Sequence, residues 1–259
     1  MLWYKSWLET RWRFLIGLAL LICSAMLIVL AYPRLIQLLQ PLAPLVPNVG
    51  ADSRVGKQLR EAAGLFSSYR GYVWSQWFRQ TMPQTWVIFA VLLGAGGLLT
   101  QTSRGGALYT LSMPVSRARL LGVRAAIGLA ELFVLAILPA LVIPLVSPLV
   151  GQTYGVGDAF VHSICLFVRG SMFFSLAFLL STAFADVWRP ALIAFCTIAV
   201  LGTMEQVFHD ALPSNMFHIM SGEQYFRGGG LPWPGLLVSA VVSAAMIYGA
   251  IANISRRDF

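Results

Sequence analysis

Three stretches of this chain contain no charged residue over about the thickness of a lipid bilayer, namely residues 14–32, 85–103 and 234–254. About 20 apolar residues in a helix cross a hydrocarbon core of about 30 Å. Because the core holds no water, backbone polar groups must bond within the chain, which restricts each stretch to a helix. With 58% apolar and only 11% charged residues, a chain of 259 residues cannot solvate the surface of a soluble fold.

Three further apolar runs have the same length but carry one charge each. The sequence therefore predicts an all-α, polytopic membrane protein with six transmembrane helices in a single transmembrane domain. The charged runs are residues 125–150, 159–185 and 190–208, which contain Glu131, Arg169 and Glu205 respectively.

The amino-terminal residues predict a helix that lies in the membrane interface before the first span. Trp3, Trp7 and Trp12 recur at helical spacing and are separated by charged residues. A secretory signal is the alternative. The run 14–32 exceeds the length of about 7–15 residues of a typical signal, and no small-residue cleavage site precedes Pro33. A retained first span is the better interpretation.

The short segment 104–124 sets the predicted orientation, because it holds four arginines and no acidic residue. Lysine and arginine concentrate in short cytoplasmic loops. We therefore expect a multi-pass protein of the cytoplasmic (inner) membrane with both termini in the cytoplasm. Residues 33–84 and 209–233 then form the outer loops.

The first outer loop has a pattern of its own, because apolar residues recur every three or four positions between Val55 and Trp77. This spacing predicts an amphipathic extracytoplasmic helix between spans one and two. Its aromatic residues lie beside Arg70 and Arg79, as in a surface that binds single-stranded nucleic acid. A membrane-interface belt explains the same mixture, so we expect contact with membrane lipid and no nucleic-acid partner. The aromatic residues are Tyr69, Tyr72, Trp74, Trp77 and Phe78.

Motifs for catalysis are missing from the sequence. Gly56-Lys57 is followed by Gln58, whereas a phosphate-binding loop needs Ser or Thr there. Glu205 and His209 lie one helical turn apart, which leaves a metal site as an alternative to a solvated helix end. We expect no catalytic, cofactor or metal-binding residue on this chain, and we do not expect an enzyme.

The three charges within the predicted spans, Glu131, Arg169 and Glu205, need an explanation, and Arg169 lies deepest in its span. Each costs about 2.5–3.5 kcal/mol at mid-bilayer, so such residues face a partner, water or the bundle interior. We interpret them first as structural charges that are ion-paired or reach the interface, with a place in a substrate path as the alternative.

Small residues at four-residue spacing mark close helix contacts on the second and sixth spans. Since one six-span chain has no second half to enclose a pathway, we expect these residues to contact a second copy of the chain or a close relative. The pairs are Ala90 with Gly94, Ser239 with Ser243, and Ala245 with Gly249.

The segment 111–117, LSMPVSR, is the most specific in the chain, with Arg124 seven residues further on and a new span behind it. It resembles the membrane (permease) subunits of type-2 ABC transporters. One departure is that such proteins carry acidic residues before this loop, whereas no acid lies between Glu61 and Glu131. Other similar features are Gly94, Gly96 and Gly97, the segment 180–184 (LSTAF) and the terminal segment 256–259 (RRDF).

The resemblance implies the transmembrane subunit of an exporter, which couples to a separate ATPase subunit through the cytoplasmic loop 104–124. ATP and Mg would belong to that partner, and two membrane subunits would pair with two ATPases. Pro114 presets a turn, and residues 117–124 could form a short basic helix that projects to dock on the ATPase. A generic basic loop, or a membrane scaffold without transport, is the alternative. The coupling residues implied are Leu111, Pro114, Val115, Ser116, Arg117, Arg119 and Arg124.

Overall fold

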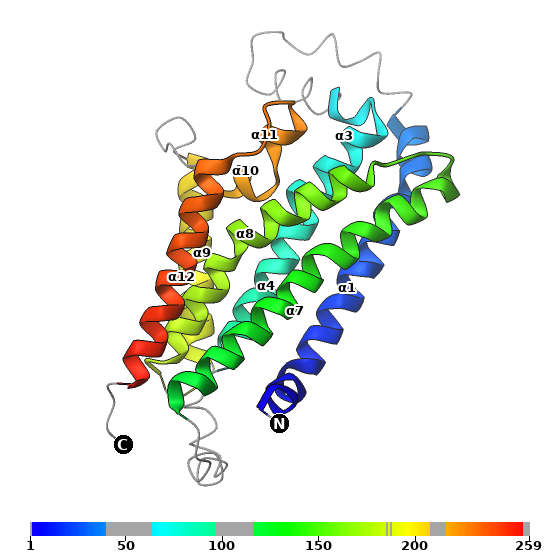
Figure 1. Ribbon diagram of the computed structural model, residues 1–259. Coiled ribbons are helices and arrows are strands. Elements are labelled where there is room, and N and C mark those ends of the chain that lie inside the picture. The colour runs from blue at the N-terminus through cyan, green and yellow to red at the C-terminus, as the bar shows by residue number, and fades with distance from the viewer. Residues whose placement is uncertain are drawn as a thin grey trace.

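The computed structural model describes residues 2–39, 64–96, 116–184, 186, 188–207 and 216–255, and every regular element in these ranges is helical. The long helices run alternately in opposite directions and form a bundle (Figure 1). We call the end of the bundle that holds the start of α1 and the last turn of α12 the lower end, and the opposite end the upper end. The long helices are α1 (Leu2–Leu39), α4 (Met82–Gly94), α7 (Arg117–Val146), α8 (Val156–Ser181), α9 (Trp188–Val207) and α12 (Trp233–Ser255).

Four stretches of the described residues are long and apolar enough to cross a membrane: Ser6–Leu38, Ala118–Val150, Val156–Ser181 and Trp233–Ile254. Large apolar side chains are exposed along them, as expected for surfaces that face lipid. The all-α class is confirmed, and the four helices are compatible with a multi-pass membrane protein. The structure does not test the count of six spans, because residues 85–103 are described only as far as residue 96 and α9 is not among the four.

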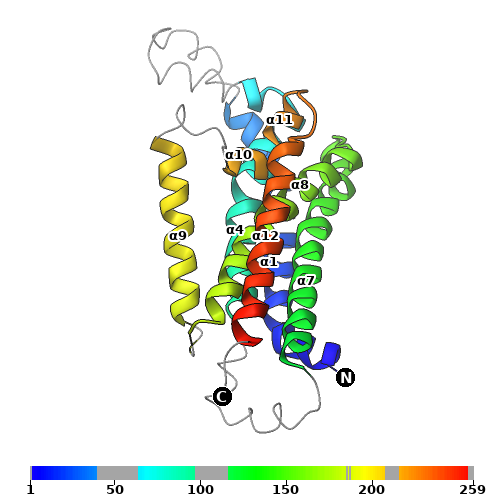
Figure 2. The ribbon, with the colours of Figure 1, turned by 60° about the vertical axis from the view of Figure 1, so that its left-hand side comes forward.

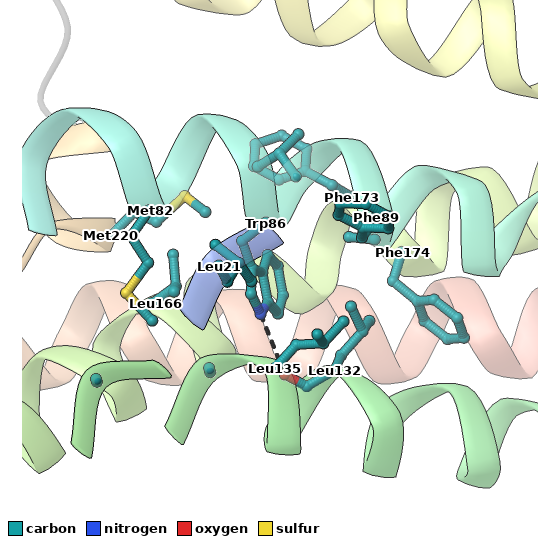
Figure 3. Packing of buried hydrophobic residues seen from close by; sticks show 14 of the residues in the cluster. Leu21, Met82, Trp86, Phe89, Leu132, Leu135, Leu166, Phe173, Phe174 and Met220 are labelled. Atoms are coloured by element: carbon teal, nitrogen blue, oxygen red, sulfur yellow. Dashed lines mark hydrogen bonds between the residues drawn. The ribbon is translucent and has the colours of Figure 1, made fainter. Parts of the chain in front are cut away.

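Helix α8 lies at the centre of the described bundle and contacts α4, α7, α9, α10 and α12. Inside the molecule, 61% of its apolar stretch is buried, against 22% for the stretches in α1 and α12. Figure 3 shows the core that results, with Trp86 of α4 reaching across to α7. The indole Nε1 of Trp86 donates a hydrogen bond to the carbonyl of Leu132 at 3.1 Å.

Glycines allow the helices around α8 to approach closely. A Cβ atom at Gly170 would lie 2.3 Å from the Trp86 ring, and one at Gly128 would lie 2.6 Å from the ring of Phe174. At Gly94, the added Cβ would lie 2.6 Å from the backbone oxygen of Phe174. Gly94 of the predicted second span therefore packs against α8 of the same chain.

The same holds for most of the small residues that we expected to contact a second copy. Ser239 and Ser243 of α12 are buried, and Ser243 lies 2.5 Å from Ser175 of α8, oxygen to oxygen. Ala90 is also fully buried, whereas Ala245 is exposed. These contacts between small residues thus hold one chain together, whereas Ala245 lies on a face of α12 that remains open to a neighbour.

Helix α1 is longer than the predicted first span of residues 14–32. It begins at Leu2, continues through Pro33 and ends at Leu39. Proline removes one backbone hydrogen bond, but Leu35 beyond it still packs against the core, which favours continuing the helix. The expected interfacial segment is part of this helix, and Figure 2 shows its first turns directed to the side at the lower end.

The aromatic residues of the predicted outer loop lie inside the protein. They belong to α3 (Tyr69–Val73) and to a π-helix, η2 (Trp74–Thr81), which leads directly into α4. The expectation of an aromatic belt facing the membrane interface is wrong for these side chains, because they pack against α1, against α8 (Val156–Ser181) and against Phe226 near the upper end. Val55, Leu59 and Ala62 of the predicted amphipathic helix lie outside the described residues. The buried side chains are Tyr69, Tyr72, Trp74, Trp77 and Phe78, which are 0–6% exposed.

The upper end is covered by a short segment that we call the upper hairpin, residues 216–232. It contains α10 (Met216–Met220) and α11 (Glu223–Phe226), joined at Gly222. Gly222 has a φ of 66°, and a Cβ there would lie 2.6 Å from Nδ1 of His162. Only glycine therefore fits this turn against α8.

Replacing Gly94 with alanine should destabilise the protein by about 1–3 kcal/mol, because the new methyl group would meet backbone rather than a movable side chain. Gly122→Ala in α7 is the matched control, since nothing lies within 4 Å of its added Cβ. This control should be neutral or stabilising by up to about 1 kcal/mol. Unfolding of both purified variants in detergent measures the difference, and equal stability would contradict the contact between α4 and α8.

Candidate functional site

At the lower end, α1, α4 and α7 meet in a polar cluster that we call the lower clamp. It consists of Glu9, Thr10 and Arg13 from α1, and of Arg124 and Glu131 from α7. Arg13 donates a hydrogen bond from Nη1 to the carbonyl of Leu92 at 2.8 Å. The last carbonyls of a helix have no partner within it and carry partial negative charge. Arg13 therefore caps the carboxyl end of α4 with a cation.

Arg124 brings α7 into the same cluster. Its Nη1 lies 3.3 Å from Oε2 of Glu9, which forms an ion pair between α7 and α1. A Cβ at Gly96 would lie 2.7 Å from Nη2 of Arg124 and 3.3 Å from Nη1 of Arg13. The two guanidinium groups therefore converge on the chain as it leaves α4, where a glycine gives them room.

Glu131 completes the clamp two turns further along α7. The hydroxyl of Thr10 donates a hydrogen bond to Oε1 of Glu131 at 2.5 Å, and Glu131 is only 5% exposed. Its Oε2 is buried and has no hydrogen-bond partner among the described residues. Glu131 thus has a partner on α1, but this partner is a hydroxyl and not the cation of an ion pair.

The structure separates the residues implied in coupling. Ser116 caps α7, because its side chain accepts a hydrogen bond from the backbone N–H of Arg119. Residues 117–124 are the first turns of the 30-residue α7 and not a separate short helix. Arg119 is exposed, whereas Arg124 turns inward to Glu9. Leu111, Pro114, Val115 and the side chain of Arg117 lie outside the described residues.

Arg169 has no carboxylate partner among the residues that the structure describes. It is 4% exposed, and its Nη1 donates to Oγ of Ser239 at 2.6 Å and to the carbonyl of Gly235 at 3.4 Å. Ser239 in turn donates to Gly235 at 2.5 Å. Arg169 therefore joins α8 to α12 through neutral groups, one of them a backbone carbonyl, and it forms no ion pair with the residues that the structure describes.

Glu205 holds α9 to the upper hairpin. Both of its carboxylate oxygens accept from the backbone N–H of Phe217, at 3.0 and 3.1 Å. The carboxylate also interacts electrostatically with Arg169, without forming an ion pair. The three predicted intramembrane charges thus lie in separate places, with Glu131 in the lower clamp and Arg169 and Glu205 nearer the upper hairpin.

The upper hairpin makes polar contacts that the sequence did not indicate. The carbonyl of Ser221 accepts from Nε1 of Trp74 at 3.2 Å and lies 2.9 Å from Nδ1 of His162. Tyr225 donates to Asp158 at 2.9 Å, and Asp158 forms an ion pair with Arg70 at 3.0 Å. The one local signal was the four-residue spacing of Asp158 and His162, which places both on one face of α8.

Glu223 lies at the base of the upper hairpin, between His218 and Arg227. Nδ1 of His218 donates to one carboxylate oxygen, and Nη2 of Arg227 lies 2.6 Å from the other. Burial alone would raise the pKa of Glu223, but the hydrogen bond and charge of His218, together with Arg227, outweigh it and lower the pKa to about 2. His209, which the alternative of a metal site included, lies outside the described residues.

Comparison with known proteins adds no family assignment. No protein-family model, curated protein or solved structure matches this chain.

Removing the guanidinium of Arg124 should destabilise the lower clamp. Arg124→Ala leaves Glu9 unpaired and empties the space beside Gly96, so we expect a loss of about 1–3 kcal/mol. Arg119→Ala, on the exposed side of the same helix, should change stability by less than about 0.5 kcal/mol. Unfolding of both variants in detergent is the measurement. Equal losses of unfolding free energy in the two variants would contradict the ion pair between Arg124 and Glu9.

Acid should weaken the upper hairpin through Glu223. Because the pKa of this carboxyl is about 2 in the folded protein against an ordinary 4.5, its contribution to stability is complete above 4.5 and is lost as the pH falls toward 2. The thermal midpoint of the wild type should therefore fall more steeply over this range than that of Glu223→Gln. Asp186→Asn, which changes a half-buried acid paired with Arg189 at the lower end, is the control for an acid outside the upper hairpin and should keep the steep fall of the wild type.

Proposed function

We propose that this chain is the transmembrane subunit of an ABC transporter of the exporter type, and that a separate ATPase subunit docks at its lower end. The lower end is then cytoplasmic, and the protein lies in the cytoplasmic membrane. The observation that supports this proposal best is the lower clamp, which lies where residues 97–115 leave α4 and enter α7. These residues include the LSMPVSR segment on which the resemblance rests.

The clamp gives this proposal a physical route for coupling. Arg13 of α1 bonds to the carboxyl end of α4, and Arg124 near the start of α7 pairs with Glu9 of α1. Both contacts therefore attach a helix end to α1. A partner that displaces the loop between α4 and α7 therefore acts on three helices at once. The partner's ATP hydrolysis would supply the energy, since the sequence of this chain holds no phosphate-binding loop.

Arg119, an exposed residue of the predicted coupling set, gives the direct contact in this proposal. Arg119 lies on the exposed side of α7, three residues after the cap residue Ser116. Arg124 acts from inside by holding the helix in place. We therefore assign the docking role to the segment 111–119 and a positioning role to Arg124.

A second copy of the chain, or a close relative, completes the proposed transporter. The described bundle keeps most of its small-residue contacts internal, so pairing would use the exposed apolar faces. Trp188, Leu192 and Val200 of α9 are 56–76% exposed, and Val241 and Tyr248 of α12 are 68% and 75% exposed. Lipid covers these faces where no second subunit does.

Replacing Arg119 with glutamate should weaken association with the ATPase at least tenfold, because one charge at a docking contact is reversed. The chain is purified in gentle detergent, the ATPase that accompanies it is identified, and both are recombined to measure binding and ATP hydrolysis. Arg34→Glu, an exposed arginine near the upper end of α1, is the matched control and should bind like the wild type.

Native mass measurement of the active complex tests the rest of this proposal, since two membrane subunits and two ATPases are expected. Unchanged binding by Arg119→Glu would mean that the basic loop serves only as a topology signal. A partner complex that hydrolyses no ATP would favour a membrane scaffold.

A further inference from the structure

The first turns of α1 expose large aromatic side chains at the lower end of the bundle. Trp3, Tyr4, Trp7 and Trp12 are 41–66% exposed. The turns that carry them are directed to the side (Figure 2). Tryptophan and tyrosine concentrate at the boundary between hydrocarbon and headgroups, because each combines an apolar ring with one polar atom. These four rings are therefore suited to that boundary.

The length of α1 also requires part of it to lie outside the hydrocarbon core. Its 38 residues extend over about 57 Å, whereas the core is about 30 Å thick. Even a tilt of about 40° would reduce its extent along the bilayer normal only to about 44 Å. Four of the first 13 residues are charged and residues 14–32 carry no charge, so the first turns are one part that lies outside.

These first turns have two faces with different surroundings. One face, which we call the aromatic face, consists of residues that recur every three or four positions: Tyr4, Trp7, Arg11 and Leu15. Leu15 is 44% exposed and belongs to the apolar stretch that can cross the membrane. The lower clamp uses another face of the same turns. The aromatic face is thus free of the clamp and continues into surface that faces lipid.

Arg11 adds a positive charge to the aromatic face. The carbon of its guanidinium lies 5.5 Å from the centre of the Trp12 ring, at the edge of this face. Its Nε is buried and has no hydrogen-bond partner among the described residues. Arg11 forms no ion pair within the same part of the chain, since Glu9 pairs with Arg124 instead. Its guanidinium therefore keeps a charge and N–H donors for an anion outside the chain.

The rest of the lower end carries an excess of basic residues. Arg13 is bonded to a helix end and not to an acid, and Arg119 is exposed. The sequence adds Arg104 between α4 and α7, and residues 97–115 include no acid. A negatively charged surface is attracted to such an end, and each basic residue close to it raises the affinity about fivefold.

We propose that the aromatic face of α1 binds the headgroups of anionic phospholipids, with Arg11 on their phosphate groups and the rings of Tyr4, Trp7 and Trp12 beside them. Aromatic and basic residues on one helical face are the combination that binds anionic membrane surfaces. The continuity of this face with the lipid-facing side of α1 favours lipid over a protein partner. Only the identification of the bound leaflet as cytoplasmic rests on the proposed function.

Binding at this face has a consequence for the lower clamp, because both lie on the same turns of α1. A ligand that binds the folded arrangement stabilises it. Anionic lipid would thus help to hold Thr10 against Glu131 and Arg13 against the end of α4. The lower clamp would be firmer in a membrane rich in such lipid.

The test is photolabelling of the full chain in phosphatidylcholine vesicles. Two probes carry the same diazirine near the headgroup, one a phosphatidylglycerol and the other a phosphatidylcholine, and labelled peptides are identified by mass spectrometry. The phosphatidylglycerol probe should label residues 2–15 at least threefold more than the phosphatidylcholine probe. Unlabelled phosphatidylglycerol should compete with it, whereas inorganic phosphate should not.

Arg11→Gln should bring the labelling ratio of the two probes in residues 2–15 close to one, because it removes the charge and keeps a long polar side chain. Arg11→Lys keeps the charge and should keep most of the ratio. Arg34→Gln is the matched control, since it removes an exposed arginine near the other end of α1, and it should keep the full ratio.

A second measurement follows the stability of the purified chain in neutral detergent. Phosphatidylglycerol should raise the thermal midpoint by about 2–4 °C more than phosphatidylcholine does, which is the shift expected from a fivefold preference. Arg11→Gln should lose this difference, and Arg34→Gln should keep it.

Three results would overturn the proposal. They are labelling of residues 2–15 by phosphatidylglycerol no stronger than by phosphatidylcholine, an unchanged ratio in Arg11→Gln, and competition by inorganic phosphate as strong as that by phosphatidylglycerol. The last would assign the site to free anions. Because no ATPase takes part, failed labelling leaves the proposed coupling intact, and failed ATPase association leaves the lipid contact intact.

Discussion

Close contact at glycines fixes the position of α8, and the other described helices are arranged around it. In a membrane, the surrounding lipid is as apolar as the side chains, so burying an apolar side chain between helices contributes little free energy. Helices therefore associate through close packing and hydrogen bonds. Trp86 lies over Gly170, while Phe174 fits against Gly94 and Gly128. Once these contacts set the distance from α8 to α4 and α7, its opposite face reaches α12 and the upper hairpin with polar groups such as Arg169 and Ser175.

The helices themselves could be predicted from the sequence, because a bilayer imposes a length and an apolar composition that can be read residue by residue. The four long apolar helices fall on predicted spans for this reason. The partners of the buried charges could not be predicted. Thr10 and Glu131 are 121 residues apart, and no local pattern joins them. The sequence places Arg124 in a basic loop, whereas in the structure it forms an ion pair with Glu9 inside the bundle. The rotation of α7 about its axis decides which of its arginines faces inward.

The aromatic segment before α4 shows a second limit of sequence reasoning. Tryptophan and tyrosine suit both a membrane interface and a protein interior, because each combines an apolar ring with one polar atom. What decides here is the presence of acceptors inside the bundle. Tyr72 donates to the carbonyl of Ile28 and Trp74 to that of Ser221. These carbonyls come from distant segments, so the inward orientation depends on the tertiary fold.

The lower clamp and Arg169 are connected by packed helices and not by loops. Arg13 holds the end of α4, and Gly94 in the last turn of α4 lies against the backbone of Phe174. Phe174 is five residues after Arg169 on the same helix, α8. Packed helices transmit displacement because their cores resist compression. A partner that moves the end of α4 would therefore shift α8 directly, and with it the guanidinium of Arg169 relative to Ser239 on α12. The same contacts that assemble the bundle would then join its lower end, where we propose that a partner docks, to Arg169.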